Sequence, residues 1–193
     1  ANLNNITWIR EKGLKLGAKV EMLRSGDVIP QIVRVLDDGD TDIVPPPQCP
    51  ECSTLLEESD EGGAGTITHR CPNKECPGRV RDTLTFIGSR EVLEIDGLGP
   101  EMAAKLAKGN FARDLGELYL FLGEIKHDIE VHGEYSFMVH MRTFGFDATI
   151  LKMAKSLGAA KTASWDRWIK ALCIPMIGET FGKIIATTLD LHP

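Results

Sequence analysis

The sequence lacks the features that would place it in several large classes of protein. None of its apolar runs approaches the ~20 residues that a membrane-spanning helix needs, and no secretory signal peptide is recognisable. It also lacks an excess of positive charge. The formal net charge is −6 over 193 residues, which argues weakly against nucleic acid, because phosphate binding favours a basic surface. We expect a soluble intracellular protein of two or three small domains, without membrane contact.

The charge is spread unevenly along the chain. Residues 142–193 carry seven Lys and Arg against four Asp and Glu, whereas residues 89–141 carry five against ten. Any contact with phosphate must therefore be local, made by backbone amides and a few cations.

Four of the five cysteines fall in two short pairs. Cys49 and Cys52 have C-x2-C spacing, Cys71 and Cys76 have C-x4-C spacing, and 18 residues separate the pairs. Four thiolates at such spacing can close a tetrahedral zinc site. They leave the metal no open position for water, so we predict a structural zinc rather than a hydrolytic one.

Two alternatives for the cysteine-rich segment are less favoured. A disulfide framework suits a short secreted chain, and this sequence is long, has no signal peptide and leaves Cys173 alone in an apolar stretch. His69 could compete as a ligand, but four cysteines make it dispensable. Between the pairs, residues 57–65 have too little apolar content to be buried, and we expect a solvated loop.

Residues 15–36 are expected to form two β-strands joined by Ser25, Gly26 and Asp27. Apolar residues alternate with polar ones here, and Pro30 fits only an edge or a bulge. Because two or three strands cannot form a stable sheet without cover, we interpret the segment as the end of a β-barrel.

Beyond the cysteines, the sequence is typical of short helices separated by glycine turns. The turn Gly97-Leu98-Gly99 precedes a helix that should begin at Pro100, with Ala103 one turn further on. Glycines let the backbone approach a ligand closely, and amides at a helix start can bind an anion.

Related patterns occur at residues 143–149 and 176–182, where Thr143 and Met176 replace the leading glycine. A single turn of this kind is more often a plain helix cap. Three copies favour an array of helix-hairpin-helix motifs, which hold DNA phosphates with main-chain amides and need little net positive charge.

The order of these segments resembles the bacterial-type NAD-dependent DNA ligases. The resemblance rests on Arg-Ser-Gly-Asp-Val-Ile-Pro at 24–30, Cys-Pro-Asn at 71–73, Ile-Asp-Gly-Leu-Gly at 95–99 and Ile-Gly-Glu-Thr at 177–180. It runs from residue 1 to about residue 189. A fragment, a phage enzyme or a ligase divided into two polypeptides would each fit it.

The resemblance implies an α+β, multi-domain fold. Residues 1–45 would be the C-terminal part of an OB-fold, that is, a partial OB β-barrel. Residues 46–82 would be a small four-cysteine zinc finger, and residues 83–193 a mainly α-helical helix-hairpin-helix domain, incomplete at its C-terminus. Together they would wrap nicked duplex DNA in replication and repair.

The family's adenylation motif is missing from this sequence. Such ligases attach AMP to the lysine of a Lys-x-Asp-Gly motif, and residues 94–97 mimic it with glutamate in place of lysine. We assign no catalytic residue and expect the chain alone to be inactive. NAD and Mg would serve the complete ligase without binding here. The implied partners are nicked double-stranded DNA and an adenylation domain or subunit, in the cytoplasm of a bacterial or phage-infected cell.

The predicted site residues form two sets. Zinc would be held by Cys49, Cys52, Cys71 and Cys76. The DNA contacts would be Arg24, Ser25, Gly26, Gly97, Leu98, Gly99, Lys105, Gly145, Phe146, Gly178, Glu179, Thr180 and Lys183. In the second set, the turn residues would act through their amides and the lysines through charge. For Arg24, the interpretation as an arginine at a strand end that contacts only solvent is almost as well supported as a DNA contact.

A second function stays open. A non-enzymatic DNA-binding module of a repair or recombination protein could also combine zinc with hairpins. The turn at residues 26–30 favours the ligase, because a generic module has no need of it.

Overall fold

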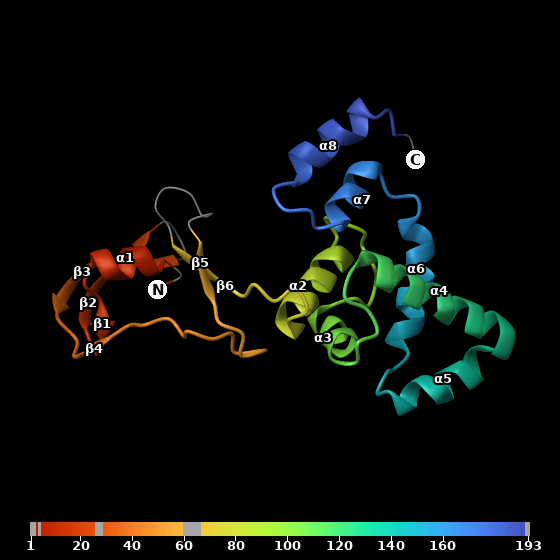
Figure 1. Cartoon of the computed structure of the whole chain (residues 1–193), viewed down its shortest axis with the longest axis horizontal. Coiled ribbons are helices and arrows are strands. Elements are labelled where there is room, and N and C mark those ends of the chain that lie inside the picture. The colour runs from red at the N-terminus through yellow and green to blue at the C-terminus, as the bar shows by residue number, and fades with distance from the viewer. Residues whose placement is uncertain (1–2, 4, 26–28, 60–66, 192–193) are drawn as a thin grey trace. The chain divides into compact units, whose positions relative to one another are not determined.

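The computed structural model describes residues 3, 5–25, 29–59 and 67–191, coloured in Figure 1. The chain separates into two compact units, Ala1–Asn73 and Lys74–Pro193, called here the N-terminal unit and the helical unit. The described residues form eight α-helices and three two-stranded antiparallel sheets. The expected α+β class is confirmed.

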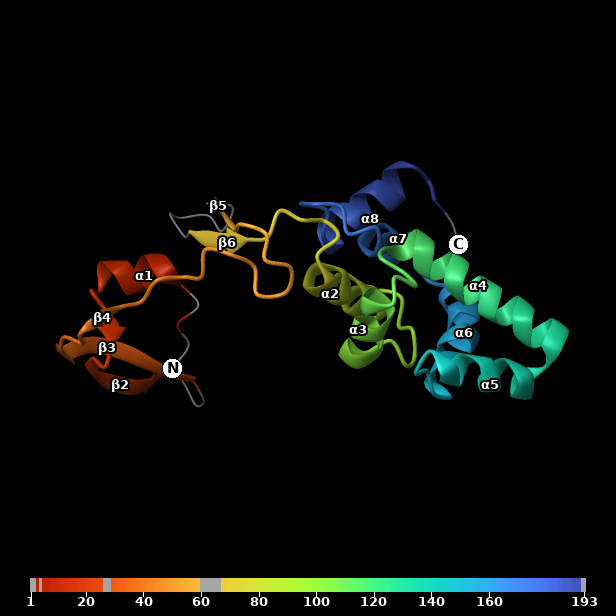
Figure 2. The same ribbon diagram turned by 60° about the horizontal axis from the view of Figure 1, so that its bottom comes forward.

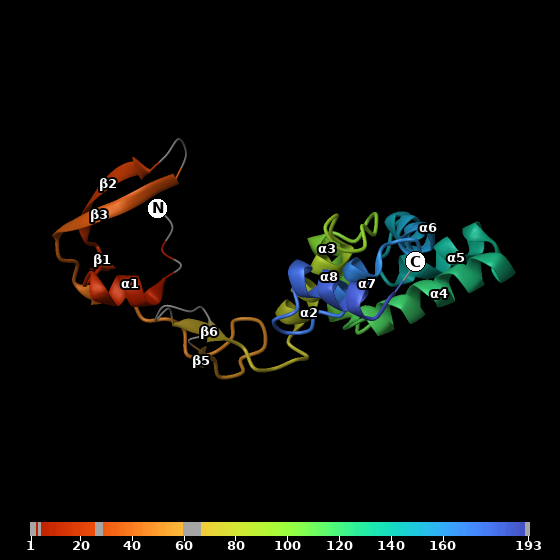
Figure 3. The same ribbon diagram turned by 90° about the horizontal axis from the view of Figure 1, so that it is seen from above.

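The N-terminal unit is built on a ribbon of two long strands. β2 (Lys19–Ser25) pairs antiparallel with β3 (Ile29–Asp37), side by side in Figure 3. This confirms the two predicted strands, and Pro30 lies opposite Arg24 in the register. The predicted joint at Gly26 and Asp27 lies outside the described residues. A second, shorter ladder pairs β1 (Lys15–Leu16) with β4 (Thr41–Asp42).

A helix that the sequence analysis did not predict precedes these strands. α1 (Ile6–Glu11) is capped by Asn5, whose side chain accepts a hydrogen bond of 3.0 Å from the Trp8 amide. Its buried residues, Ile6 and Ile9, form a small core with Leu14. An asparagine before apolar residues spaced by three is a recognisable helix start.

The β2–β3 ribbon leaves much apolar surface exposed. Met22, Leu23 and Leu36 each expose about half of their surface or more, although Val20, Ile32 and Val35 pack against the small core. Whether the ribbon belongs to an OB barrel stays a prediction.

The segment between the cysteine pairs is partly ordered. β5 (Glu57–Ser59) pairs antiparallel with β6 (Thr68–Arg70). The expectation of a solvated loop from residue 57 onward was wrong for its first three residues, because cross-strand pairing orders them although they bury little. Residues 60–66 lie outside the described part.

Seven helices make up the described part of the helical unit. They are α2 (Pro77–Gly88), α3 (Pro100–Lys108), α4 (Leu115–His132), α5 (Glu134–Thr143), α6 (Thr149–Ala160), α7 (Trp165–Ala171) and α8 (Glu179–Thr188). α2 packs on α3, α4 packs on both α5 and α6, and α7 packs on α8, as Figures 1 and 2 show.

One apolar core runs through α2 to α7. The buried residues of α2 (Val80, Leu84 and Ile87) and of α4 (Leu118, Leu122 and Ile125) follow steps of three and four, which place them on one helix face. Four methionines that we took from the sequence to be packing residues do pack in or against this core: Met102, Met138, Met141 and Met153.

The side chains of Arg167 and Lys170 attach α7 to the turn after α2. Arg167 donates to the carbonyl oxygens of Val92 and, at 2.8 Å, of Arg90, and Lys170 donates to that of Glu91 at 2.9 Å. These bonds hold the α7–α8 pair against the rest of the unit, since α8 itself packs mainly on α7.

Within the described residues, no helix combines the length and apolar character of a membrane span.

Candidate metal centre and glycine turns

The four paired cysteines converge on one point. Their sulfur atoms all lie within 4.8 Å of one another, and the Sγ atoms of Cys52 and Cys71 are 3.5 Å apart. A tetrahedral zinc with Zn–S bonds of about 2.3 Å requires sulfur separations of about 3.8 Å, whereas a disulfide requires about 2 Å. Both the donor set and the spacing therefore fit a metal ion held by four thiolates.

The first cysteine pair is shaped by a tight turn. The Ser53 amide donates to the Cys49 carbonyl at 2.8 Å, and the Cys49 amide donates back across the turn to the Thr54 carbonyl at 2.8 Å. Ser53 has a positive φ of 57°, which closes the turn and brings the sulfurs of Cys49 and Cys52 to the same side. Thr54 Oγ1 lies 3.2 Å from Cys52 Sγ.

The last cysteine of the cluster starts a helix. Cys76 is the N-cap of α2, with Pro77 in the first helical position, and it is 1% exposed. The positive end of the helix dipole lies at this sulfur and favours a thiolate. In the N-terminal unit, His69 instead pairs with Glu58 at 3.3 Å. The metal-binding group found among the described residues contains only the four cysteines.

Two of the three glycine turns share one backbone geometry. The Leu98 amide donates to the Ile95 carbonyl, and the Ile177 amide to the Ile174 carbonyl, both at 3.1 Å. The third residue of each turn has positive φ, 88° at Gly97 and 67° at Met176, which is the type II pattern. Gly99 and Gly178 then cap α3 and α8.

The middle turn differs from the predicted alignment. Thr143, which we aligned with Gly97, is the last residue of α5, and it is Gly145 that has positive φ, 78°. The Gly145 and Phe146 amides donate to Arg142 and Met141 carbonyls at 3.0 and 3.2 Å. This is a Schellman end to α5, so the middle turn is a helix C-cap before α6.

These hydrogen bonds involve three of the amides that were predicted to face phosphate. The amides of Leu98, Gly145 and Phe146 donate to backbone carbonyls. Within the described part of the chain, the structure gives no acceptor to the amides of the remaining turn residues, which are Gly97, Gly99, Gly178, Glu179 and Thr180.

α3 and the first turn are joined to the segment around α6. Lys105 Nζ donates to the Gly145 carbonyl at 3.2 Å, and the Asp96 amide donates to Ser156 Oγ at 3.0 Å. A surface pocket lies where the two segments meet; its lining includes Gly97, Gly99, Lys105, Asp147 and Thr149. Lys105 is therefore already engaged with protein rather than free.

A capping carboxylate lies beside this pocket. Asp147 Oδ1 accepts a hydrogen bond of 2.9 Å from the Thr149 amide. Hydrogen bonds from Thr149, with a smaller contribution from the charge of Lys105, lower the pKa of Asp147.

The third turn carries an exposed ion pair. Lys183 Nζ lies 2.6 Å from Glu179 Oε1, one helical turn away. The hydrogen bond and charge of each partner lower the pKa of Glu179 and raise that of Lys183. In the N-terminal unit, Arg24 is exposed in β2 and Ser25 ends that strand, while Gly26 lies outside the described residues.

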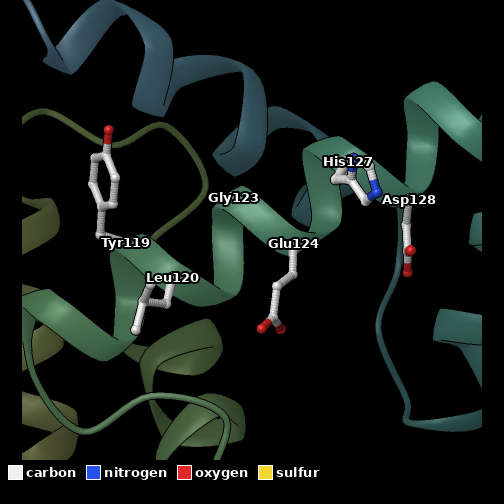
Figure 4. Close-up of a pocket in the computed structure, with 6 residues that line it drawn as sticks. All are labelled: Tyr119, Leu120, Gly123, Glu124, His127 and Asp128. Atoms are coloured by element: carbon white, nitrogen blue, oxygen red, sulfur yellow. The ribbon is translucent and has the colours of Figure 1, made fainter.

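Another pocket lies along one helix that the sequence analysis did not single out. Its lining consists of α4 residues alone (Figure 4): Tyr119, Leu120, Gly123, Glu124, His127 and Asp128. Leu120, Glu124 and Asp128, spaced by four, point to one side, and Tyr119 points away from them. Tyr119 instead makes an edge contact with Trp168. The i, i+4 spacing of exposed residues on α4 is the only sequence signal for it.

The fold and the cysteine cluster define the class of protein. It has a four-cysteine metal centre and a helical unit with recurrent glycine turns. No family model matches the chain, but curated proteins are similar to it. The DNA ligase of Shouchella clausii (strain KSM-K16) is 33% identical over 190 residues, that of Bacillus subtilis (strain 168) 31% over 190, and that of Sulfurovum sp. (strain NBC37-1) 34% over 197.

These alignments cover nearly all of this chain but only part of each relative. They include 96% of the chain for the first two and 99% for the third, but only 26%, 26% and 27% of the relatives. The chain thus spans about a quarter of the length of the curated relatives that it matches. It is homologous to a segment of DNA ligases, which confirms the resemblance recognised in the sequence.

Proposed function

We propose that this chain is the DNA-binding part, or a separate DNA-binding subunit, of an NAD-dependent DNA ligase. It holds nicked double-stranded DNA while the phosphodiester bond is formed in replication and repair. The observation that carries the proposal is the alignment of DNA ligases with 96% of the chain. An adenylation domain or subunit, acting with NAD and Mg in the cytoplasm, supplies the chemistry.

Each segment has a part in this function. Residues 1–45 form part of an OB-fold, supported by the β2–β3 ribbon and its exposed apolar residues. Residues 46–82 form a zinc finger, supported by the sulfur cluster. Residues 83–193 form the helix-hairpin-helix domain, supported by the repeated turn geometry at Gly97 and Met176.

The free amides explain how an acidic chain can bind DNA. At the starts of α3 and α8, Gly99, Gly178 and Glu179 present N–H groups without an acceptor in the described part. Such donors bind phosphate by the partial positive charge of a helix N-terminus. They contact the backbone of DNA and so carry no sequence information, which suits an enzyme that seals nicks in any sequence.

The cysteines would hold zinc in a folding role. Four thiolates complete the tetrahedral coordination that a structural zinc requires, which leaves the metal no open position for a water. The metal therefore contributes to the stability of residues 46–82, not to ligation.

A complementation assay tests the proposal. The chain is titrated with nicked duplexes of two unrelated sequences, then mixed with an adenylating ligase fragment that lacks this segment, with NAD and Mg. We expect equal affinity for both sequences and restored nick sealing. Binding without complementation across several such fragments would favour the non-enzymatic module, and failure to bind nicked DNA would refute both functions.

A further inference from the structure

Met176 is the most exposed large apolar side chain in the described part of the chain, at 90%. Its backbone also has a φ of 67°, in the left-handed region that side chains other than glycine seldom occupy. An apolar side chain gains nothing in water from such exposure. Neither the exposure nor the conformation is explained by packing within the helical unit.

The local sequence makes this position more unusual. Pro175 precedes Met176 in the second position of the turn, and the third position of a type II turn strongly favours glycine. Backbone strain of this kind concentrates where a protein binds or acts.

The matching turn shows a position where packing leaves no room for a side chain. A Cβ atom on Gly97 would lie 2.6 Å from Thr149 Cγ2, so no side chain fits there. The turn at Met176 has the same hydrogen bond and the same sign of φ, yet it projects a long side chain into open space. The two turns differ in their side chains while sharing a backbone.

Met176 also lies beside the amides proposed to hold phosphate. It precedes Gly178, the N-cap of α8, by two positions, which limits the distance between their Cα atoms to about 7 Å. A methionine side chain can reach the sugar that adjoins a phosphate bound there.

We propose that Met176 makes an apolar contact with the deoxyribose next to the phosphate held at the start of α8. The inference rests on the proposed DNA-binding function and names one residue of that surface. Its contact is with groups common to every nucleotide, so it adds affinity without sequence preference. Methionine is among the apolar residues that minor-groove-binding proteins place against DNA.

The test compares two substitutions of the same residue in the full chain. Met176→Ala keeps the Cβ atom and the left-handed backbone but removes the apolar side chain, and it should weaken binding to a nicked duplex about tenfold. Met176→Leu keeps the apolar bulk and should bind within about twofold of the original chain. Asn110→Ala, at another left-handed position (φ 53°), controls for a strained turn and should leave affinity unchanged.

The salt dependence separates an apolar contact from a lost phosphate contact. Loss of a phosphate contact lowers the slope of log K against log salt by about 0.9, whereas loss of the Met176 side chain should leave the slope unchanged. Equal binding by Met176→Ala and the original chain, or a loss shared by Asn110→Ala, would overturn the inference while leaving the proposed function intact. Failure of the original chain to bind nicked DNA would overturn both.

Discussion

Gly97→Ala should destabilise the helical unit through two separable effects. The residue has a φ of 88°, where an alanine costs about 1–2 kcal/mol. The new Cβ would also meet Thr149 Cγ2 at 2.6 Å and the Thr149 carbonyl oxygen at 3.1 Å, and relieving such overpacking costs about 1–3 kcal/mol. We expect a total loss of about 2–5 kcal/mol in the free energy of unfolding.

Two other glycines provide matched controls. Gly145 has a similar φ of 78° at its Schellman helix end but nothing within 4 Å of an added Cβ, so Gly145→Ala should show the backbone cost alone, about 1–2 kcal/mol. Gly99 has a φ of −93° and also has open space around an added Cβ. Its replacement by alanine should cost less than about 1 kcal/mol, through the weaker N-cap.

Urea unfolding followed by helical circular dichroism measures all three variants against the original chain. The difference between Gly97→Ala and Gly145→Ala isolates the contact between the first turn and Thr149 at the start of α6. If these two variants lose the same free energy with unchanged m-values, the close approach of Gly97 to α6 does not hold, and the reasoning from the turn geometry is refuted.

Three further predictions concern the metal, a capping carboxylate and a lysine. Chelation of the metal, or Cys76→Ser, should unfold residues 46–82, because structural zinc binding contributes on the order of 10–16 kcal/mol; a melting curve unchanged by a chelator would contradict a structural metal. The pKa of Asp147 is lowered by hydrogen bonds from Thr149, so its contribution to stability is present above the unfolded pKa of about 3.9 and is lost as pH falls through the lower folded value. Between about pH 5 and pH 2, Asp147→Asn should therefore lose less stability than the original chain, and parallel melting-temperature profiles would be evidence against this cap. Lys105→Met removes the hydrogen bond to the Gly145 carbonyl and should increase amide hydrogen exchange at residues 143–149, with Lys108→Met as a control on the same helix that should not.

Local features were predictable from the sequence because their partners are near in the chain. The two cysteine pairs each close within a few residues, so their spacing alone indicated a shared metal site, and the sulfurs do converge. The β2–β3 ribbon and the starts of α3 and α8 follow equally local rules for alternation and capping. α1 was predictable in the same way from Asn5 and was overlooked.

Features that depend on a neighbouring element were not predictable. The alignment of Thr143 with Gly97 failed because residue 143 continues α5, and only the helix end decides which residue takes the left-handed conformation. The predicted amide donors Leu98, Gly145 and Phe146 turned out to be used by carbonyls three to five residues earlier. A sequence motif indicates where a turn occurs, but not which of its amides remain free.

The sequence by itself determined the ligand set of the metal centre, the strand ribbon, the positions of the glycine turns and the relationship to DNA ligases, because all four depend on residue type and short spacing. Only the tertiary structure decided that Lys105 is bound to a carbonyl 40 residues away, that Gly97 lies against α6 and that Met176 is left uncovered. The physical reason is that packing between helices distant in sequence sets which donors are satisfied and which side chains are exposed.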